Sequence, residues 1–159
     1  MSGGPVTLQI RRMRWWDLPR VVELDAALFP DTAWTSAMFW SELAGVPHTR
    51  DYVVAHAVDG IVGYGGVMTV ARDATVQTLG VAPSWQRQGL GRRILDDLVV
   101  RARQRLATQV WLEVGRDNLA AVALYAAADF APVSVRRDYY GAGRDAVIMR
   151  RRLHQDVSS

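Results

Sequence analysis

The spacing of apolar residues along the chain predicts strands and amphipathic helices in alternation. Alternating or continuous apolar runs, typical of strands, occupy seven segments, namely residues 6–13, 52–58, 61–70, 75–81, 109–114, 130–135 and 145–152. Apolar side chains at helical spacing mark four other segments, namely one that follows Asp17, one from Thr35 to about Gly45, one from Gly89 to Gln104, and one from Asn118 to Ala128. The order β-α-α-β-β-β-α-β-α-β-β predicts an α/β (α+β) domain in which helices cover both faces of a mixed sheet.

Capping and turn residues support these boundaries. Asp17 and Thr35 are suitable N-caps, and Pro19 falls in the first turn of the first helix. Asp59–Gly60 stands between two strand patterns and is a strong signal for a two-residue hairpin. Pro83 ends the strand before it.

The length of 159 residues suits one core, so we expect a single domain over 1–159 with an ordered part from about 6 to 153. The first five and last five residues are expected to be loose ends. The chain has no cysteine, which excludes disulfides and a cysteinyl acyl-enzyme. The longest apolar run, 119–128, is about half of the ~20 residues that cross a bilayer, and no signal-peptide pattern is present, so we expect a cytoplasmic protein without a membrane partner.

The charge pattern adds little about partners. The net charge is +3, and all 19 basic residues are arginine. This balance permits contact with nucleic acid or a ribosomal surface, but the arginines are scattered in pairs and no nucleic-acid motif occurs. We therefore expect no direct nucleic-acid partner.

A candidate anion site lies where the strand 75–81 gives way to the helix that begins near Gly89. Two glycines, Gly89 and Gly91, stand at this helix start. The first N–H groups of a helix have no partner within it, and the positive end of the helix dipole attracts phosphate. Without side chains at these glycines, a bulky pyrophosphate could approach the backbone. Arg87 and Arg92 flank this phosphate cradle, residues 86–92, and could add charge-assisted bonds.

Two other glycine-rich motifs do not match this segment. A Walker loop needs a lysine, and the chain has none. A dinucleotide-binding fingerprint needs a third glycine and a place directly after the first strand. The remaining alternative is a glycine-rich helix start that only permits tight packing.

Glu113 is a candidate general base, because it is one of only three glutamates and lies within the apolar strand 109–114. A carboxylate in such a setting is costly unless it is paired, hydrated or used. If it is half desolvated, it holds a proton more readily, which suits a base near neutral pH. The alternative is an edge-strand or salt-bridged glutamate, with Arg116 as a possible partner.

Asn118 and Tyr125 are seven residues apart and therefore share one face of the last helix. Asn118 is expected to cap this helix, with contact to a ligand as a further role. Tyr125 is flanked by alanines, and its phenol could protonate a departing thiolate. The alternative for Tyr125 is an aromatic plug between helix and sheet.

These motifs together resemble a known family. The run Gln86-Arg87-Gln88-Gly89-Leu90-Gly91 matches the Gln/Arg-x-x-Gly-x-Gly/Ala signature of the GNAT acetyltransferases. Within that superfamily the chain resembles the ribosomal-protein alanine N-acetyltransferase (RimI) family in three segments, namely Trp111-Leu112-Glu113-Val114, Ala123-Leu124-Tyr125 and Arg136-Arg137-Asp138-Tyr139-Tyr140. It departs from the family pattern at Gly115, where an arginine is usual, and at Ala82, where an acidic residue is usual.

The resemblance implies a GNAT fold, with a mixed, mostly antiparallel central sheet of about seven strands and four helices on both faces. It implies acetyl-CoA as cosubstrate, no metal, and a gap between the strands of Val81 and Glu113 that admits pantetheine. Glu113 would be the base and Tyr125 the acid. The cofactor-binding residues that it implies are Leu79, Gly80 and Val81 through their backbones, Arg87, Gln88, Gly89, Leu90, Gly91 and Arg92 at the pyrophosphate, and Asn118. The acceptor slot would be lined by Phe29, Pro30, Tyr139 and Tyr140.

The activity implied by the resemblance is acetyl transfer to the N-terminal α-amino group of a protein by direct attack in a ternary complex. The implied acceptor is the alanine-starting small-subunit ribosomal protein eighteen. Three alternatives stay open, namely a GNAT enzyme that acts on lysine side chains or a small amine, an inactive acyl-CoA-binding regulatory module, and an RNA- or ribosome-binding module.

Overall fold

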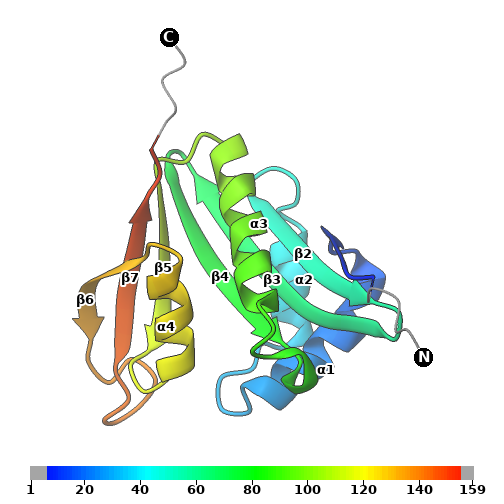
Figure 1. Ribbon diagram of the computed structural model, residues 1–159, viewed down its shortest axis with the longest axis horizontal. Helices are drawn as coiled ribbons and strands as arrows, with labels where there is room; N and C mark the ends of the chain where they lie inside the picture. The colour runs from blue at the N-terminus through cyan, green and yellow to red at the C-terminus, as the bar shows by residue number, and fades with distance from the viewer. Residues whose placement is uncertain (1–6, 155–159) are drawn as a thin grey trace.

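A computed structural model describes residues 7–154 and has one seven-stranded sheet in the order β1-β2-β3-β4-β5-β7-β6 (Figure 1). The strands are β1 Gln9–Arg12, β2 Arg50–Ala57, β3 Gly60–Val70, β4 Asp73–Val81, β5 Gln109–Gly115, β6 Ala131–Arg136 and β7 Ala146–Arg152. The α-helices are α1 Leu18–Leu28, α2 Ser36–Leu43, α3 Leu90–Gln104 and α4 Leu119–Ala127, and short 3-10 turns occupy Trp15–Asp17 and Pro83–Trp85. The element order predicted from hydrophobic spacing is confirmed. The two ends of the chain, residues 1–6 and 155–159, lie outside the part that the structure describes.

The helices cover both faces of the sheet, as expected. Figure 1 shows α3 and α4 in front of the sheet and α1 and α2 behind it. The apolar stripe of α3 accounts for this packing, because its members are buried against the strands, namely Leu90, Ile94, Leu95, Leu98, Val99 and Ala102. Every strand pair except one is antiparallel, and the exception is β4 with β5. The fold is therefore the mixed, mostly antiparallel α/β architecture that the sequence predicted.

The predicted caps are correct in two of three cases. The Thr35 hydroxyl accepts a hydrogen bond from the N–H of Met38, and Asn118 Oδ1 accepts one from the N–H of Ala121, both at 3.2 Å. The prediction for Asp17 is wrong, since its side chain makes no cap bond to α1. Its buried carboxylate instead accepts from Arg11, at 2.8 and 2.9 Å. A paired arginine stabilises a buried carboxylate more than one helix N–H does.

The two halves of the sheet part between β4 and β5. These parallel strands pair only at their first residues, from Asp73 with Gln109 to Thr75 with Trp111. Further along, the β3–β4 register skips Gln77, because Gly66 pairs with Thr78 while the next residue pairs with Val76. Such a bulge bends the strand that carries the extra residue. The later part of β4 thus turns away from β5 and leaves an opening between them.

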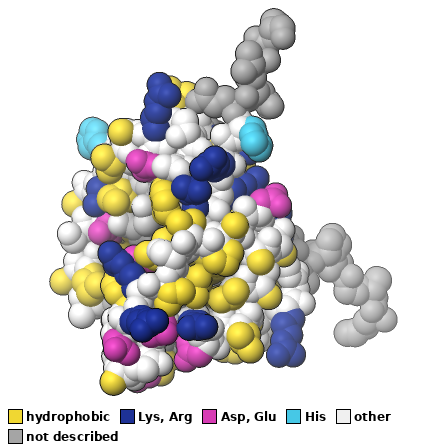
Figure 2. All heavy atoms as spheres, turned by 90° about the vertical axis from the view of Figure 1, so that its left-hand side faces the viewer, with side chains coloured by type: hydrophobic (Ala, Val, Ile, Leu, Met, Phe, Trp, Pro, Cys, Tyr) yellow, Lys and Arg dark blue, Asp and Glu magenta, His cyan; other side chains and the backbone are white. Residues whose placement is uncertain are grey.

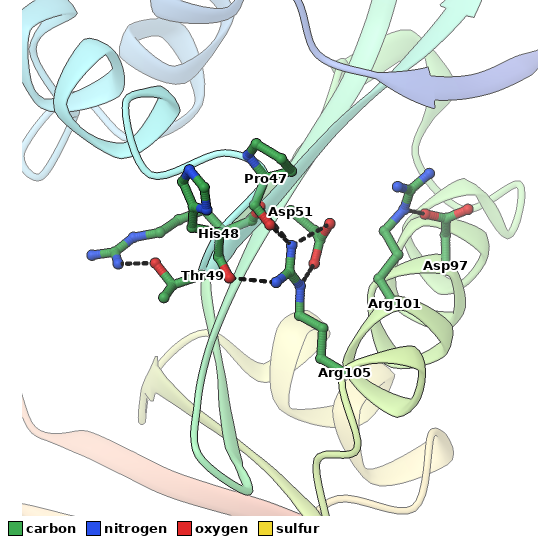
Figure 3. Close-up of polar contacts among 8 residues, drawn as sticks. Pro47, His48, Thr49, Asp51, Asp97, Arg101 and Arg105 are labelled. Carbon is green, nitrogen blue, oxygen red and sulfur yellow. Dashed lines mark hydrogen bonds and ion pairs between the residues drawn. The ribbon is translucent and has the colours of Figure 1, made fainter.

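Arg105 directly follows α3 and connects the C-terminal end of this helix to the loop before β2 (Figure 3). Its Nε lies 2.5 Å from Asp51 Oδ2, and its Nη1 donates to the carbonyl of His48 at 2.6 Å. It also donates to the carbonyl of Pro47. One side chain therefore satisfies a largely buried carboxylate and two loop carbonyls.

Strand β6 forms the outer edge of the sheet and lies on the side that Figure 2 turns toward the viewer. All six of its residues are exposed, including Val133 and Val135. Figure 2 shows apolar side chains in a band across this face, with arginines around them. Pro132 offers no N–H to another strand, which hinders edge-to-edge pairing. Within the described residues, no helix is long and apolar enough to span a bilayer.

Candidate active site

A cleft of about 340 Å³ lies where β4 and β5 part. Residues of α1, the following loop, both strands, α4 and the β6–β7 loop line it. They include Asp25, Phe29, Thr32, Trp34, Gln77, Leu79, Glu113, Asp117, Asn118, Leu124, Tyr125, Tyr140 and Arg144. The structure thus brings both predicted catalytic residues, Asn118, Leu79, Phe29 and Tyr140 to one cavity.

The edge of β4 that faces away from β3 carries main-chain groups without a partner strand. The N–H of Ala82 donates to the carbonyl of Val62, so these residues form a hydrogen-bonded pair of the β3–β4 ladder. Such pairs alternate along an antiparallel ladder, so the next one joins Gly80 to Tyr64. The main-chain groups of Leu79 and Val81 therefore face away from β3. Leu79 lines the cleft, whereas the carbonyl of Val81 accepts a hydrogen bond from Gln86 Nε2 at 3.0 Å, so at Val81 only the N–H is available. The expectation that the backbone of Gly80 also binds pantetheine is wrong, because its polar groups face β3.

Gly80 has a different role, which is to make room for an aromatic ring. A Cβ placed on Gly80 would lie 2.5 Å from the ring and hydroxyl of Tyr64, which is fully buried. No side chain fits at that distance. The glycine lets Tyr64 lie across β4 at the level of the cleft.

The phosphate cradle has free backbone donors. Gly89 is the N-cap of α3 with φ +82°, a left-handed conformation that favours glycine, and no side chain caps the helix. Within residues 7–154, the first hydrogen bond of this helix runs from Arg93 N–H to Gly89, and the N–H groups of 87–92 donate to no other residue. Arg87, Gln88 and Gly89 are exposed. The cradle can therefore bind an anion through its main chain.

Gly91 and Leu90 occupy the inner side of the cradle. A Cβ on Gly91 would lie 3.3 Å from Leu124 Cδ2, which is tight, so the absent side chain keeps α3 and α4 close together. Leu90 is buried and anchors the helix start in the core. The close packing against Leu124 therefore favours glycine at 91, and the absence of a side chain also leaves room for a phosphate. The alternative of a purely structural glycine is thus half correct for Gly91, but it does not account for the free donors.

The two cradle arginines differ in availability. Arg92 is bound on both sides of its guanidinium, to Asp96 Oδ1 at 2.9 Å and to the carbonyl of Ala127 at 2.9 Å. The expectation that its side chain adds charge to the cradle is therefore not met in this conformation, and its main-chain N–H remains the available donor. The exposed Arg87 makes no described ion pair and can reach toward a phosphate.

Glu113 lies at the rim of the cleft and not within an apolar strand interior. Period-two alternation sends Leu112 and Val114 into the core and Glu113 to the other face, where its side chain keeps 32% of its surface exposed. The proposed partner Arg116 is wrong, since Arg116 pairs with Asp145 at 3.5 Å. Glu113 Oε1 instead accepts from Arg136 Nη1 at 3.1 Å.

Arg136 and Tyr139 surround the Glu113 carboxylate. The guanidinium of Arg136 lies 5.2 Å from the centre of the Tyr139 ring. The nearby Glu113 carboxylate raises the pKa of Tyr139 above its ordinary value, so the phenol keeps its proton beside the carboxylate. Sequence reasoning missed Arg136 as a site residue, although it opens the Arg-Arg-x-Tyr-Tyr segment that carried the resemblance.

Tyr125 is 8% exposed, faces the cleft, and packs edge-on against Phe130 at 6.0 Å between ring centres. Burial, together with the nearby phenol of Tyr140, raises the pKa of Tyr125 to about 12. The aromatic-plug alternative is correct as far as packing goes. The hydroxyl nevertheless belongs to a side chain of the cleft wall and holds its proton across the physiological range.

The four expected acceptor residues divide into two pairs. Phe29 and Tyr140 line the cleft, whereas Pro30 and Tyr139 are exposed beside it. The rings of Tyr139 and Tyr140 are 5.0 Å apart and edge-on. Arg144 Nη2 and Asp31 Oδ2 approach to 3.7 Å, so the two loops that bear these residues meet at the entrance.

A cleft between two parting parallel strands, with free helix amides beside it, is the arrangement of an acetyl-CoA-dependent acetyltransferase. Comparison with known proteins gives the same result, since the model of the acetyltransferase (GNAT) family matches residues 9–130. The chain belongs to this family.

Several similar proteins are named as N-terminal or ribosomal-protein alanine acetyltransferases. N-alpha-acetyltransferase RimI of Mycobacterium tuberculosis is 43% identical over 141 residues, which are 85% of this chain and 86% of that protein. The crystal structure of the ribosomal-protein-S18-alanine N-acetyltransferase from Escherichia coli has a TM-score of 0.82 at 25% identity and covers 96% of this chain and 99% of its own. A Salmonella typhimurium acetyltransferase structure with its cofactor acetyl-CoA has a TM-score of 0.78 at 18% identity, over 95% and 96% of the chains, and shares the fold.

Proposed function

We propose that this enzyme transfers the acetyl group of acetyl-CoA to the N-terminal α-amino group of a protein, with ribosomal protein bS18 as the acceptor. The names of the relatives support the reaction and the acceptor. The observation that carries the proposal is the cleft, which joins free backbone edges of β4 to a carboxylate and a phenol. A ribosomal acceptor would place the reaction in the cytoplasm.

The residues of the chain fit a coenzyme A thioester. The amides of 87–92 would hold the pyrophosphate. The main-chain groups of Leu79 and the N–H of Val81 would bind the pantetheine amides in the manner of an added strand. Asn118 lines the cleft and could reach the same ligand. Bound acetyl-CoA supplies an activated acetyl group as a thioester.

Proton removal from the acceptor falls to Glu113. An α-amino group has a pKa of about 8, so its deprotonation near pH 7 costs little. Glu113 at the rim of the cleft would accept this proton through a water, while Arg136 orients the carboxylate. Holding the amine beside the thioester can lower the activation barrier by roughly 7–11 kcal/mol.

Two further groups handle the charge that develops during attack. An N–H on the free edge of β4, at Leu79 or Val81, would bind the carbonyl oxygen as it becomes negative. As the new C–N bond forms and the C–S bond breaks, Tyr125 would give its proton to the leaving thiolate.

The proposal is tested by mass spectrometry of peptides incubated with enzyme and acetyl-CoA. One peptide starts with Ala-Arg and carries an internal lysine, and its matched control has a blocked N-terminus. We expect one acetyl group on the free N-terminus and none on the blocked peptide. Acetylation of the lysine in both peptides would instead indicate a side-chain acetyltransferase. Acetyl-CoA binding without any product would indicate a regulatory module.

A further inference from the structure

Asp25 is a buried acid to which the proposed reaction gives no task. It lies on α1 and is 2% exposed, although it borders the cleft. Its Oδ2 accepts a hydrogen bond from the N–H of Trp34 at 2.8 Å, and its Oδ1 accepts one from the hydroxyl of Tyr64. A carboxylate so deep in a protein is costly unless it is fully bonded, so both donors matter to it.

One of these donors leads to the acceptor side of the cleft. Trp34 belongs to the acceptor loop, defined here as residues 29–35, and lines the cleft with Phe29 and Thr32. The ring of Trp34 packs against Phe39 of α2 at 5.0 Å between centres, and Phe39 packs against Tyr64 at 6.3 Å. The acceptor loop is thus attached to its surroundings through Asp25 and a short aromatic stack.

The other donor leads to the strand that faces the thioester. Tyr64 is fully buried in β3, opposite Gly80 of β4, and the glycine gives its ring direct access to that strand. Gly80 directly follows Leu79, which lines the cleft and whose main-chain groups face away from β3. Burial and the bond to Asp25 raise the pKa of Tyr64 well above its ordinary value, so its hydroxyl remains a donor.

We propose that Asp25 and Tyr64 are positioning residues that hold the acceptor loop in register with the thioester-binding edge of β4. They would act without touching either substrate, because the contacts run through the Trp34 amide on one side and through Gly80 on the other. The inference rests on the proposed function, since it assumes that the acceptor binds beside residues 29–35. Removing the link should misplace the amine relative to the thioester carbonyl, and small misplacements are costly in rate.

The first test is steady-state kinetics of Tyr64→Phe and Asp25→Ala with acetyl-CoA and the Ala-Arg peptide. Tyr64→Phe keeps the ring and removes one donor to Asp25, whereas Asp25→Ala removes both bonds. For Tyr64→Phe we expect kcat/KM for the peptide to fall about tenfold, as for loss of a buried bond to a charged group. The loss should be larger for Asp25→Ala. The Kd of acetyl-CoA should change less than about twofold, since the phosphate cradle is intact.

Val99→Ala is the matched control for lost stability, because Val99 is buried in α3 and takes no part in the network. It should lower Tm without the kinetic loss. The double variant Tyr64→Phe/Asp25→Ala should be no worse than Asp25→Ala alone, because both changes break one chain of contacts. Wild-type kcat/KM in Tyr64→Phe, or equal losses in peptide kinetics and acetyl-CoA affinity, would overturn the proposal.

Amide hydrogen exchange gives a readout that needs no turnover. In Tyr64→Phe, exchange should speed up in peptides that cover 29–35 and 78–82, and in Val99→Ala it should not. Unchanged exchange in both segments of Tyr64→Phe would refute the coupling, and this measurement decides the matter if Asp25→Ala does not fold. A wild-type enzyme that acetylates no N-terminal peptide would refute the proposed function and leave the exchange result standing.

Discussion

At the scale of single residues, Glu113 is both ion-paired and accessible to solvent. Its carboxylate accepts a hydrogen bond from Arg136 at 3.1 Å, and about a third of its side-chain surface is exposed. We expect Glu113→Gln to lower kcat by roughly 10²–10⁴, the range for loss of a general base. The Kd of acetyl-CoA should stay nearly constant. Both are measurable by a thiol-release assay and by titration calorimetry.

Glu23→Gln is the matched control for this change, because Glu23 lies on the exposed face of α1 and, within residues 7–154, pairs only with Arg20. It should leave kcat unchanged. If Glu113→Gln kept wild-type kcat over the pH range 6–9, another group would have to accept the proton.

The raised pKa of Tyr125 gives a pH dependence with a definite sign. The acid form of the phenol is the one that protonates thiolate, and burial keeps this form up to about pH 12 instead of 10. We therefore expect kcat to show no loss centred near pH 10. The folded state also holds this proton more tightly than the unfolded chain, so the associated stability is present below pH 10 and is lost as pH rises toward 12.

Tyr125→Phe tests the same assignment at fixed pH. The ring contact with Phe130 survives this substitution, so Tm should change little. We expect kcat to fall by roughly tenfold or more through loss of the acid. A Tyr125→Phe enzyme with full kcat would reduce Tyr125 to a packing residue.

At the scale of elements, the start of α3 depends on the backbone conformation of Gly89, whose φ is +82°. Gly89→Ala places a side chain in a left-handed conformation at a cost of about 1 kcal/mol and crowds the free amides. The Kd of acetyl-CoA, measured by titration calorimetry, should rise about tenfold, because the cradle loses its shape.

Gly143→Ala controls for backbone strain alone, since Gly143 also has a positive φ, of +73°, but lies in the β6–β7 loop. It should leave the Kd of acetyl-CoA unchanged. Equal effects of the two variants would mean that the cradle conformation does not determine cofactor affinity.

The opposite end of α3 makes a separate prediction about stability. Arg105→Met leaves Asp51 and two loop carbonyls without their donor (Figure 3), so the free energy of unfolding should fall by about 2 kcal/mol. Arg101→Met breaks the pair with Asp97 within one helix and should cost less than about 1 kcal/mol. Urea unfolding measures both. Equal losses would show that Arg105 is an ordinary surface arginine.

At the scale of the whole molecule, the two halves of the sheet are joined by only three β4–β5 residue pairs near one end of the cleft. A ligand that bonds to the free edge of β4 and also contacts α4 would connect the halves. At 100 times its Kd, acetyl-CoA should add about 2.7 kcal/mol to the free energy of unfolding. Hydrogen exchange should slow in 76–81 and also in 109–125, and protection confined to one half would contradict a bridging ligand.

Whether a prediction from the sequence was correct depends on how far apart along the chain the interacting residues lie. Apolar spacing placed α3 to within a residue, because that signal is local. Asp59–Gly60 correctly indicated the hairpin between β2 and β3, but the two-residue turn lies one residue earlier, at Val58–Asp59, since Gly60 already pairs with Ala57. The capping role predicted for Asp17 was wrong because its carboxylate binds Arg11. This arginine lies in β1, outside the helix that Asp17 was expected to cap. Arg136 was missed as the partner of Glu113 because 23 residues separate them along the chain.

The site divides in the same way. Residues 86–92 can be read as a candidate anion site from the sequence itself, since the first amides of a helix have no partner within it and two glycines add no side chains over them. The availability of Arg92 and the direction of the Gly80 backbone depend on α4 and on the β3–β4 register, which no local pattern encodes.

The sequence by itself determined the order of elements, the exclusion of a cysteine nucleophile and the candidate carboxylate, phenol and glycines, because periodicity, composition and helix-end chemistry are local properties. Only the tertiary structure decided that β4 bends away from β5 at Gln77, that Glu113 faces Arg136 at a rim, and that Asp25 connects the acceptor loop to Tyr64. These outcomes depend on which segments far apart in the sequence come into contact, and strand register and packing determine those contacts.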